Sequence, residues 1–114
     1  MKFEKSCGTV IYRVAEKKLL YLIIKNVSCV HWGYPKGHSI QEEDEETTAI
    51  REAYEETGLN VAIIKGYKNT ITYYPKPDIT KEVVYFIAHS DNEKVYIQKD
   101  EVSEYKWCQY SVAY

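Results

Sequence analysis

The sequence lacks the features that mark secreted, zinc-binding and membrane-spanning proteins. Its three cysteines, Cys7, Cys29 and Cys108, are odd in number, widely spaced and include no Cys-x-x-Cys pair. This pattern argues against a disulfide framework or a cysteine-based zinc site and predicts free thiols in a reducing compartment. No apolar run approaches transmembrane length, and the N-terminal residues form no signal-peptide core. We therefore expect a cytoplasmic protein without a membrane partner.

The chain also has little net charge and no sign of subdivision. A formal charge of −2 argues against strong electrostatic capture of nucleic acid, so no stable nucleic-acid partner is expected. The 114 residues contain no internal repeat, low-complexity segment or linker. One domain spanning residues 1–114, with one modest core, is the expectation, and we expect it to be monomeric.

What the chain does have is a strong local concentration of acid. From Glu42 to Glu56 there are eight acidic residues and one basic residue, which leaves nine acidic and fourteen basic residues elsewhere. If residues from about Glu43 to Thr57 are helical, Glu52, Glu55 and Glu56 lie on one face of the helix. Like charges at that spacing raise each other's pKa, and a hard cation such as Mg2+ relieves the repulsion. The alternative is a solvated acidic helix that binds a basic protein.

The acidic helix is part of a longer pattern between Gly37 and Leu59. The fixed positions of this pattern are Gly37, Glu43, Arg51, Glu52, Glu55, Glu56 and Gly58. They fill the signature of the Nudix hydrolases, and the chain resembles that family over nearly its whole length. The resemblance implies hydrolysis of a phosphoric anhydride in a nucleoside diphosphate linked to another moiety. It also implies dependence on Mg2+, with Mn2+ as an alternative.

The resemblance assigns roles to residues of the signature. It implies metal ligation by Glu52, Glu55, Glu56 and the Gly37 carbonyl, and it implies that Arg51 orients a catalytic carboxylate. The helical spacing of Arg51 and Glu55 also predicts an ion pair. Gly58 is predicted to cap the helix in the left-handed conformation.

The general base is open between two residues. In some Nudix hydrolases the base is the carboxylate that matches Glu52, and in others it is a glutamate from a late loop. Glu101 lies six residues before Trp107, where such members place theirs. Glu104 is nearer to Trp107 and is more simply a surface charge.

The segments that flank the signature resemble one subgroup. The run Trp32–His38 (WGYPKGH) is similar to the segment that precedes the helix in asymmetrical diadenosine tetraphosphate hydrolases. This implies that Lys36 and His38 bring positive charge to the phosphate chain. Tyr74 follows Gly58 by sixteen residues and Lys81 follows Tyr74 by seven, as in that subgroup. Tyr74 would stack on adenine and Lys81 would meet a phosphate, while Tyr73 would face the other side of the strand.

Strand-like runs surround the acidic helix. They are Cys7–Arg13, Leu19–Lys25, the short extended piece His31–Pro35, Val61–Ile64, Tyr67–Tyr74, Glu82–His89, Lys94–Gln98 and Glu104–Cys108. Strands on both sides of one long helix indicate an α+β or α/β domain. The resemblance implies the Nudix fold, a mixed β-sheet in an α/β/α sandwich with the Nudix-box helix lining the active site.

Two further expectations concern the helices. An apolar stripe of Ala49, Ile50, Ala53 and Tyr54 is predicted to pack on the sheet. The family's last helix would begin near Ser111, but the chain stops at Tyr114, so this C-terminal helix is expected to be short or missing.

The sequence thus predicts a Nudix hydrolase with a small-molecule nucleotide substrate, which cleaves diadenosine tetraphosphate asymmetrically to ATP and AMP. The alternatives within the family are trimming of RNA 5′ ends and hydrolysis of a nucleoside triphosphate or a sugar nucleotide. A catalytically silent module that binds nucleotide or protein is an alternative of another class. The intact set of carboxylates argues against it.

Overall fold

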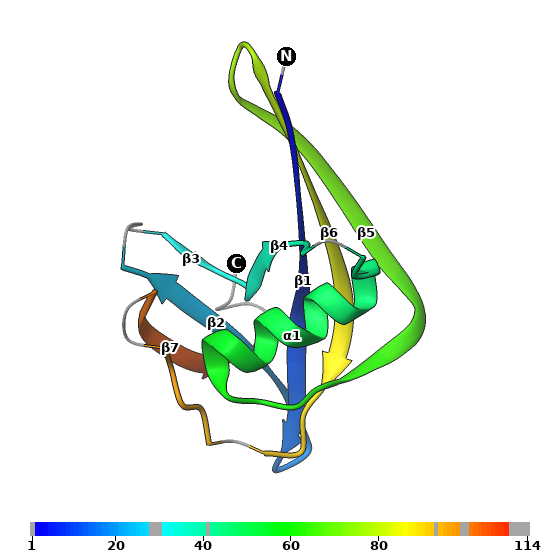
Figure 1. The fold of residues 1–114 in the computed structure, drawn as a ribbon. Helices are drawn as coiled ribbons and strands as arrows, with labels where there is room; N and C mark the ends of the chain where they lie inside the picture. Colours follow the sequence, from blue (N-terminus) through cyan, green and yellow to red (C-terminus); the bar gives the residue numbers. More distant parts are fainter. Residues whose placement is uncertain (1, 28–30, 41, 93, 99–100, 110–114) are drawn as a thin grey trace.

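The protein is described by a computed structural model that covers residues 2–27, 31–40, 42–92, 94–98 and 101–109. Within these ranges there are seven strands and one helix (Figure 1). The strands are β1 (Lys2–Ala15), β2 (Lys18–Asn26), β3 (Trp32–Gly33), β4 (Lys36–His38), β5 (Ala62–Lys76), β6 (Ile79–His89) and β7 (Val102–Cys108). The helix, α1, spans Glu45–Thr57. Cys29 and the predicted start of a last helix near Ser111 lie outside the described residues.

The strands form one mixed sheet with β1 near its centre. The order is β3-β2-β1-β6-β5, with β4 paired to β1 and β7 paired to β2. β6 lies parallel to β1 from Lys2 to Tyr12, and the other pairs are antiparallel. On its other side β1 is shared: Ser6–Gly8 pair with β4, and Tyr12–Ala15 pair with β2. The mixed sheet predicted from the family resemblance is confirmed.

Two local features of the backbone shape the sheet. Glu16 and Lys17, with φ of 51° and 66°, form a two-residue turn that joins β1 and β2 in a hairpin. β5 runs without a break where two strands were expected. Gly66, with a φ of 92°, lies where the pairing with β6 shifts between Ile63 and Lys68. A bulge of this kind bends a strand without ending it.

α1 begins and ends with defined caps. Asp44 has extended backbone, and its side chain accepts a hydrogen bond from the Thr47 N–H at 2.7 Å. Gly58 ends the helix with a φ of 75°, and its N–H donates to the Tyr54 carbonyl at 2.8 Å. The predicted left-handed cap is confirmed, and the helix starts two residues later than expected because Asp44 is its N-cap.

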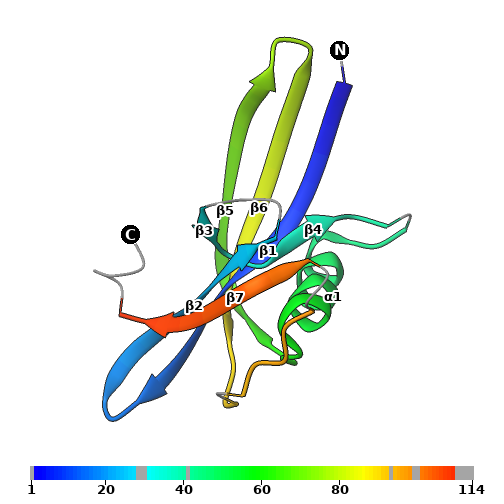
Figure 2. The ribbon, with the colours of Figure 1, turned by 90° about the vertical axis from the view of Figure 1, so that its left-hand side faces the viewer.

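α1 covers one face of the sheet (Figure 2). Ala49 and Ala53 are fully buried against strand residues that include Cys7, Ile11, Leu22, Ile24, Val84, Phe86 and Ala88. Tyr54 is 54% exposed, so its place in the predicted apolar stripe is wrong. The buried face of the helix contains Ala49, Ala53 and Glu56. Tyr54 follows Ala53 in the sequence and therefore points away from the centre of this face.

Residues 94–98 are not the strand that was predicted. Their backbone instead meets the end of α1, where Tyr96 N–H donates to the Thr57 carbonyl at 2.8 Å and Gln98 N–H to the Glu56 carbonyl at 3.4 Å. The last carbonyls of a helix have no partner inside the helix, so they compete well for these donors.

Two smaller observations complete the fold. Cys7 and Cys108 are free and buried, as expected. Within the described ranges, no helix is both long enough and apolar enough to cross a membrane.

Candidate active site

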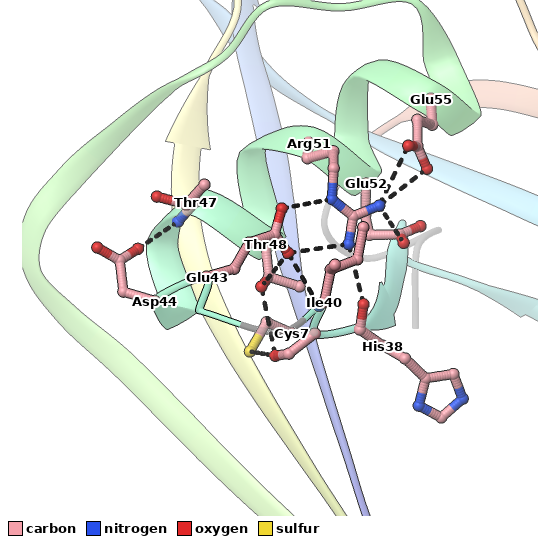
Figure 3. A network of polar contacts seen from close by, with 11 residues as sticks. Cys7, His38, Ile40, Glu43, Asp44, Thr47, Thr48, Arg51, Glu52 and Glu55 are labelled. Atoms are coloured by element: carbon pink, nitrogen blue, oxygen red, sulfur yellow. Dashed lines mark hydrogen bonds and ion pairs between the residues drawn. The ribbon is translucent and has the colours of Figure 1, made fainter.

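Arg51 is the centre of a network that ties the start of α1 to the strand before it (Figure 3). Its Nε and Nη2 donate to the two carboxylate oxygens of Glu43 at 2.7 and 3.1 Å. Its Nη1 donates to Glu52 at 3.0 Å and to Glu55 at 3.1 Å, which includes the predicted helical pair. Its Nη2 also donates to the His38 carbonyl at 2.9 Å. The guanidinium therefore fixes two carboxylates of α1 relative to the loop.

Glu43 is the main anchor of this arginine. Its carboxylate also accepts hydrogen bonds from the Thr48 hydroxyl at 2.9 Å and from the Ile40 N–H at 3.1 Å. The bonds from Arg51, followed by those from Ile40 and Thr48, lower the pKa of Glu43 to about 2. Sequence reasoning identified Glu43 as a fixed position of the signature but gave it no role, although its fixed spacing from Arg51 was a signal that the two residues act together.

Gly37 in β4 lies directly against the carboxylate of Glu52. A Cβ atom at position 37 would be 2.0 Å from the Glu52 Cδ and 2.3 Å from both carboxylate oxygens. No real Cβ makes such contacts, so the Glu52 carboxylate occupies the space that a side chain at position 37 would need. This steric reason for glycine is separate from the backbone role that the family resemblance implies.

Glu56 is a buried acid beside Glu52. Only 5% of its surface is exposed. Burial raises the pKa of Glu56 to about 8, and the charge of Glu52, a hydrogen bond with Glu52 and the charge of Glu101 act in the same direction. A hydrogen bond from the Lys36 backbone opposes the shift. At neutral pH this shift keeps much of Glu56 protonated in the metal-free protein.

An acidic hollow of about 460 Å³ brings these groups together. Its walls are formed by Asn26, Val27, Lys36, Gly37, His38, Ile40, Arg51, Glu52, Glu56 and Glu101. Most predicted site residues therefore share one cavity, including Glu101 from the turn before β7. The hollow also contains Asn26, Val27 and Ile40, which sequence reasoning did not identify and which carry no motif signal.

Three predicted site residues lie outside both of the hollows described for this molecule. Glu55 is half-exposed and bonds to Arg51. Tyr74 is 67% exposed. Lys81 lies 3.8 Å from Glu4 in an ion pair.

The donor set suits a hard divalent cation. Among the described residues, no three His, Cys, Asp or Glu side chains converge as a ready metal site, in keeping with the orientation of Glu55 toward Arg51. Glu52 and Glu56, however, are hydrogen-bonded carboxyl groups that repel each other when both are ionised, and Glu101 lies close enough to add to that repulsion. A cation bound between these carboxylates would relieve the repulsion, so the carboxylates present fit Mg2+ or Mn2+.

An aromatic hollow of about 750 Å³ lies on the sheet face opposite α1. Its apolar lining includes Val10, Tyr21, Ile23, Trp32, Tyr34, Tyr67, Ile71, Tyr85 and Ile87. Tyr34 and Tyr85 meet edge to face at 6.0 Å. The segment from Trp32 to His38 contributes to both hollows. Residues 32–34 line the aromatic hollow, residues 36–38 line the acidic hollow, and the buried Pro35 lies between them. The two hollows are therefore neighbours along the chain.

Tyr85 lines this aromatic hollow, and Tyr73 lies close to Tyr85 without lining it. Burial raises the pKa of Tyr85 to about 12, and nearby Tyr73 and Glu56 contribute to the shift. Tyr73 pairs with Lys81 and therefore shares a face with Tyr85, whereas Tyr74 points to the other side of β5. Of the two tyrosines considered from the sequence, Tyr73 is the one that approaches the hollows.

Known proteins resemble this chain in sequence and in structure. The model of the NUDIX domain matches residues 3–113. The asymmetrical bis(5′-nucleosyl)-tetraphosphatase of Caenorhabditis elegans is 33% identical, over 92% of this chain and 78% of that protein. The enzyme of the same name from Mus musculus is 29% identical, over 90% of this chain and 77% of that protein.

The structural comparison agrees with the sequence comparison. The solved C. elegans Ap4A hydrolase in a binary complex superimposes with a TM-score of 0.87 and 33% identity, over 96% of this chain and 82% of that chain. The family match at residues 3–113 includes the sheet, the caps of α1 and the Arg51 network. The chain belongs to the Nudix hydrolase family.

Proposed function

We propose that this Nudix hydrolase cleaves diadenosine tetraphosphate asymmetrically, to ATP and AMP, with Mg2+ as its metal. The observation that carries the proposal is that the two hollows are neighbours along the chain, because Trp32–His38 contributes to both. A phosphate chain beside the carboxylates would place a nucleoside within reach of the aromatic hollow. The similarity to enzymes named for this reaction supports the same substrate.

The metal would be held by oxygen donors of α1 and β4. Glu52 and Glu56 are the central pair, and the Gly37 carbonyl is the backbone donor that the family resemblance implies. Glu55 would join them only after leaving Arg51, to which it is bonded at 3.1 Å. When bound, Mg2+ neutralises phosphate oxygens and promotes the ionisation of water.

The chain's own residues would position the substrate and move the proton. Arg51 holds Glu52 through a 3.0 Å bond, while Lys36 and His38 line the hollow, where both would contact the phosphates and Lys36 would add positive charge. We assign the proton acceptor to Glu101. Glu52 is already engaged by Arg51 and by Glu56, whereas Glu101 is an exposed carboxylate on the wall of the hollow.

The nucleoside would be recognised by aromatic rings rather than by the signature. Tyr73 is our candidate for stacking, in place of Tyr74, because it shares a face with Tyr85 and the aromatic hollow. Lys81 pairs with Tyr73 across β5 and β6, so its ammonium group would reach the phosphates from the same face once it leaves Glu4.

A substrate panel tests the proposal. The protein is incubated with Mg2+ and, separately, with diadenosine tetraphosphate, nucleoside triphosphates, sugar nucleotides and RNA carrying a 5′ triphosphate or cap, and the products are separated by anion-exchange chromatography. We expect ATP and AMP in equal amounts from the dinucleotide, with the highest kcat/KM of the panel. No ATP from the dinucleotide, together with rapid turnover of another substrate, would refute the proposal.

The assignment of Glu101 has its own control. Glu101→Gln should lower kcat by about 10²-fold or more, as expected for loss of a general base. Glu104→Gln is the matched variant, because Glu104 lies three residues away, is exposed and pairs with Lys25 at 3.7 Å. Equal activity of the two variants would exclude Glu101 as the base.

A further inference from the structure

Trp32 and Lys106 form a contact that the hydrolytic mechanism does not use. The Nζ atom of Lys106 in β7 lies 4.6 Å from the centre of the Trp32 ring. Trp32 belongs to β3 and lines the aromatic hollow, and 37% of its surface is exposed. The face of an aromatic ring carries negative potential and attracts a cation, and among aromatic side chains tryptophan gives the strongest cation–π interaction.

The strand register explains why these two residues meet. Lys106 pairs with Ile23, and Trp32 pairs with Lys25, on opposite edges of β2. Ile23 and Lys25 are two residues apart and so lie on the same face of β2. Lys106 and Trp32 therefore share that face, which is the face of the aromatic hollow.

Lys106 is not part of the wall of the hollow, whereas Trp32 is. The ammonium group thus lies over the indole without lining the hollow, and Trp32 still forms part of its wall. Without that contact, a half-exposed side chain on a two-residue strand would have to be ordered by the ligand itself. Ordering a side chain in advance removes part of the cost of binding.

We propose that Lys106 is a positioning residue that holds the Trp32 ring in place to receive the base of an adenine nucleotide. The inference rests on the proposed function insofar as it takes the aromatic hollow as the nucleoside site. Lys106 acts through Trp32 and not on the phosphates. Its contribution is therefore to affinity, and the chemical step is independent of it.

Kinetics of two substitutions test this role. Lys106→Met keeps the length of the side chain and removes the charge, and we expect KM for the dinucleotide to rise about two- to fivefold with kcat unchanged. Lys106→Arg keeps a cation over the ring and should restore KM. An unchanged KM in Lys106→Met, or a fall in kcat alone, would overturn the proposal.

A matched control separates positioning from stability. The guanidinium of Arg13 lies 4.9 Å from the centre of the Trp107 ring, and the register of β2 puts this pair on the opposite face of the sheet. Arg13→Met removes the same kind of contact away from the hollow. It should lower the melting temperature without raising KM, and a rise in KM equal to that of Lys106→Met would show that both variants act through stability.

A double-mutant cycle distinguishes action through Trp32 from direct contact with phosphate. Trp32→Leu alone should weaken binding about tenfold, as expected for loss of a stacking ring. Lys106→Met should add no further loss in the Trp32→Leu protein. A further loss there would mean that Lys106 meets the phosphates directly, and the proposal would fail.

Calorimetric titration with ATP in metal-free buffer makes the test independent of turnover. The wild-type protein should bind ATP more tightly than Lys106→Met by the same two- to fivefold factor, about as large as the change in KM. If the dinucleotide is not hydrolysed but this difference is found, the proposed function fails and the role of Lys106 stands. If the dinucleotide is hydrolysed and the difference is missing, the role of Lys106 fails alone.

Discussion

Gly37→Ala is the sharpest test of how the site is built, because it would place one methyl group against Glu52, a carboxylate of the proposed metal site. The added Cβ would lie 2.0 Å from the Glu52 Cδ. Carbon atoms in contact prefer about 3.5 Å or more, so the carboxylate would have to move by about 1.5 Å. That movement breaks the 3.0 Å bond from Arg51 and removes Glu52 from its position beside Glu56.

The expected effect is large on activity and small on stability. A misplacement of about 1 Å at a reacting centre costs about 10²-fold in rate, so kcat should fall by at least that factor. Gly37 does not have a positive φ, and alanine is therefore compatible with its backbone. The flexible end of Glu52 can absorb most of the steric conflict, so the loss in unfolding free energy should be about 1 kcal/mol.

The assay is steady-state hydrolysis of the dinucleotide with Mg2+, measured together with urea denaturation. Gly33→Ala is the control, because no atom lies within 4 Å of a Cβ at that position in the neighbouring strand β3. Its kcat should stay within about threefold of the wild-type value. If Gly37→Ala keeps a similar kcat, the close packing of Gly37 on Glu52 has no catalytic meaning and our reasoning is wrong.

Three further predictions follow from the geometry. Glu56→Gln should stay folded and lose turnover. The metal-free wild-type protein should lose stability as the pH rises from about 4.5 to about 8, because the unfolded state releases the proton that Glu56 keeps in the folded state. Thermal melts of Glu56→Gln should not show this dependence of stability on pH. Gly58→Ala should cost about 1–2 kcal/mol in urea denaturation, since its φ is 75° and the new Cβ would lie 3.1 Å from the Tyr96 Cβ, whereas Gly58→Asn should cost less. Tyr73→Leu should raise KM about tenfold while Tyr74→Leu leaves it unchanged, and the reverse order would restore Tyr74 as the stacking residue.

Much of the fold was readable from local patterns. The charged turn at Glu16 and Lys17, the left-handed cap at Gly58 and the strand-forming runs of β1 and β2 are all determined by neighbours in the chain. The strand predicted at residues 94–98 has a similar composition, but the prediction was wrong. Two N–H groups of this segment donate to carbonyls at the end of α1 instead of to a neighbouring strand. That choice depends on which free acceptor lies nearby, and no local pattern contains this information.

The candidate site divides in the same way. Spacing along one helix placed Arg51, Glu52 and Glu56 together, and the position of Glu101 before Trp107 led to the same cavity. Spacing was less informative for the tyrosines. The register shift near Gly66 and the later shift between Tyr73 and Lys76 are properties of the strand pair, and they decide which ring faces the hollow.

The aromatic hollow was missed for a related reason. Tyr34 and Tyr85 lie 51 residues apart in the sequence, and no spacing pattern connects these two of the 12 tyrosines. Only the pairing of β1 with both β4 and β6 brings them together.

The attachment of residues 94–98 to the end of α1 has an evolutionary consequence. It is made by main-chain N–H groups, which every residue except proline supplies, and it leads directly to the turn that carries Glu101. Substitution of the exposed side chains of Lys94, Tyr96 and Gln98 should therefore leave this attachment in place, whereas Val95 is part of the core. An insertion or deletion there would displace Glu101. Changes in the length of this loop should therefore be tolerated less well than substitutions of its exposed side chains.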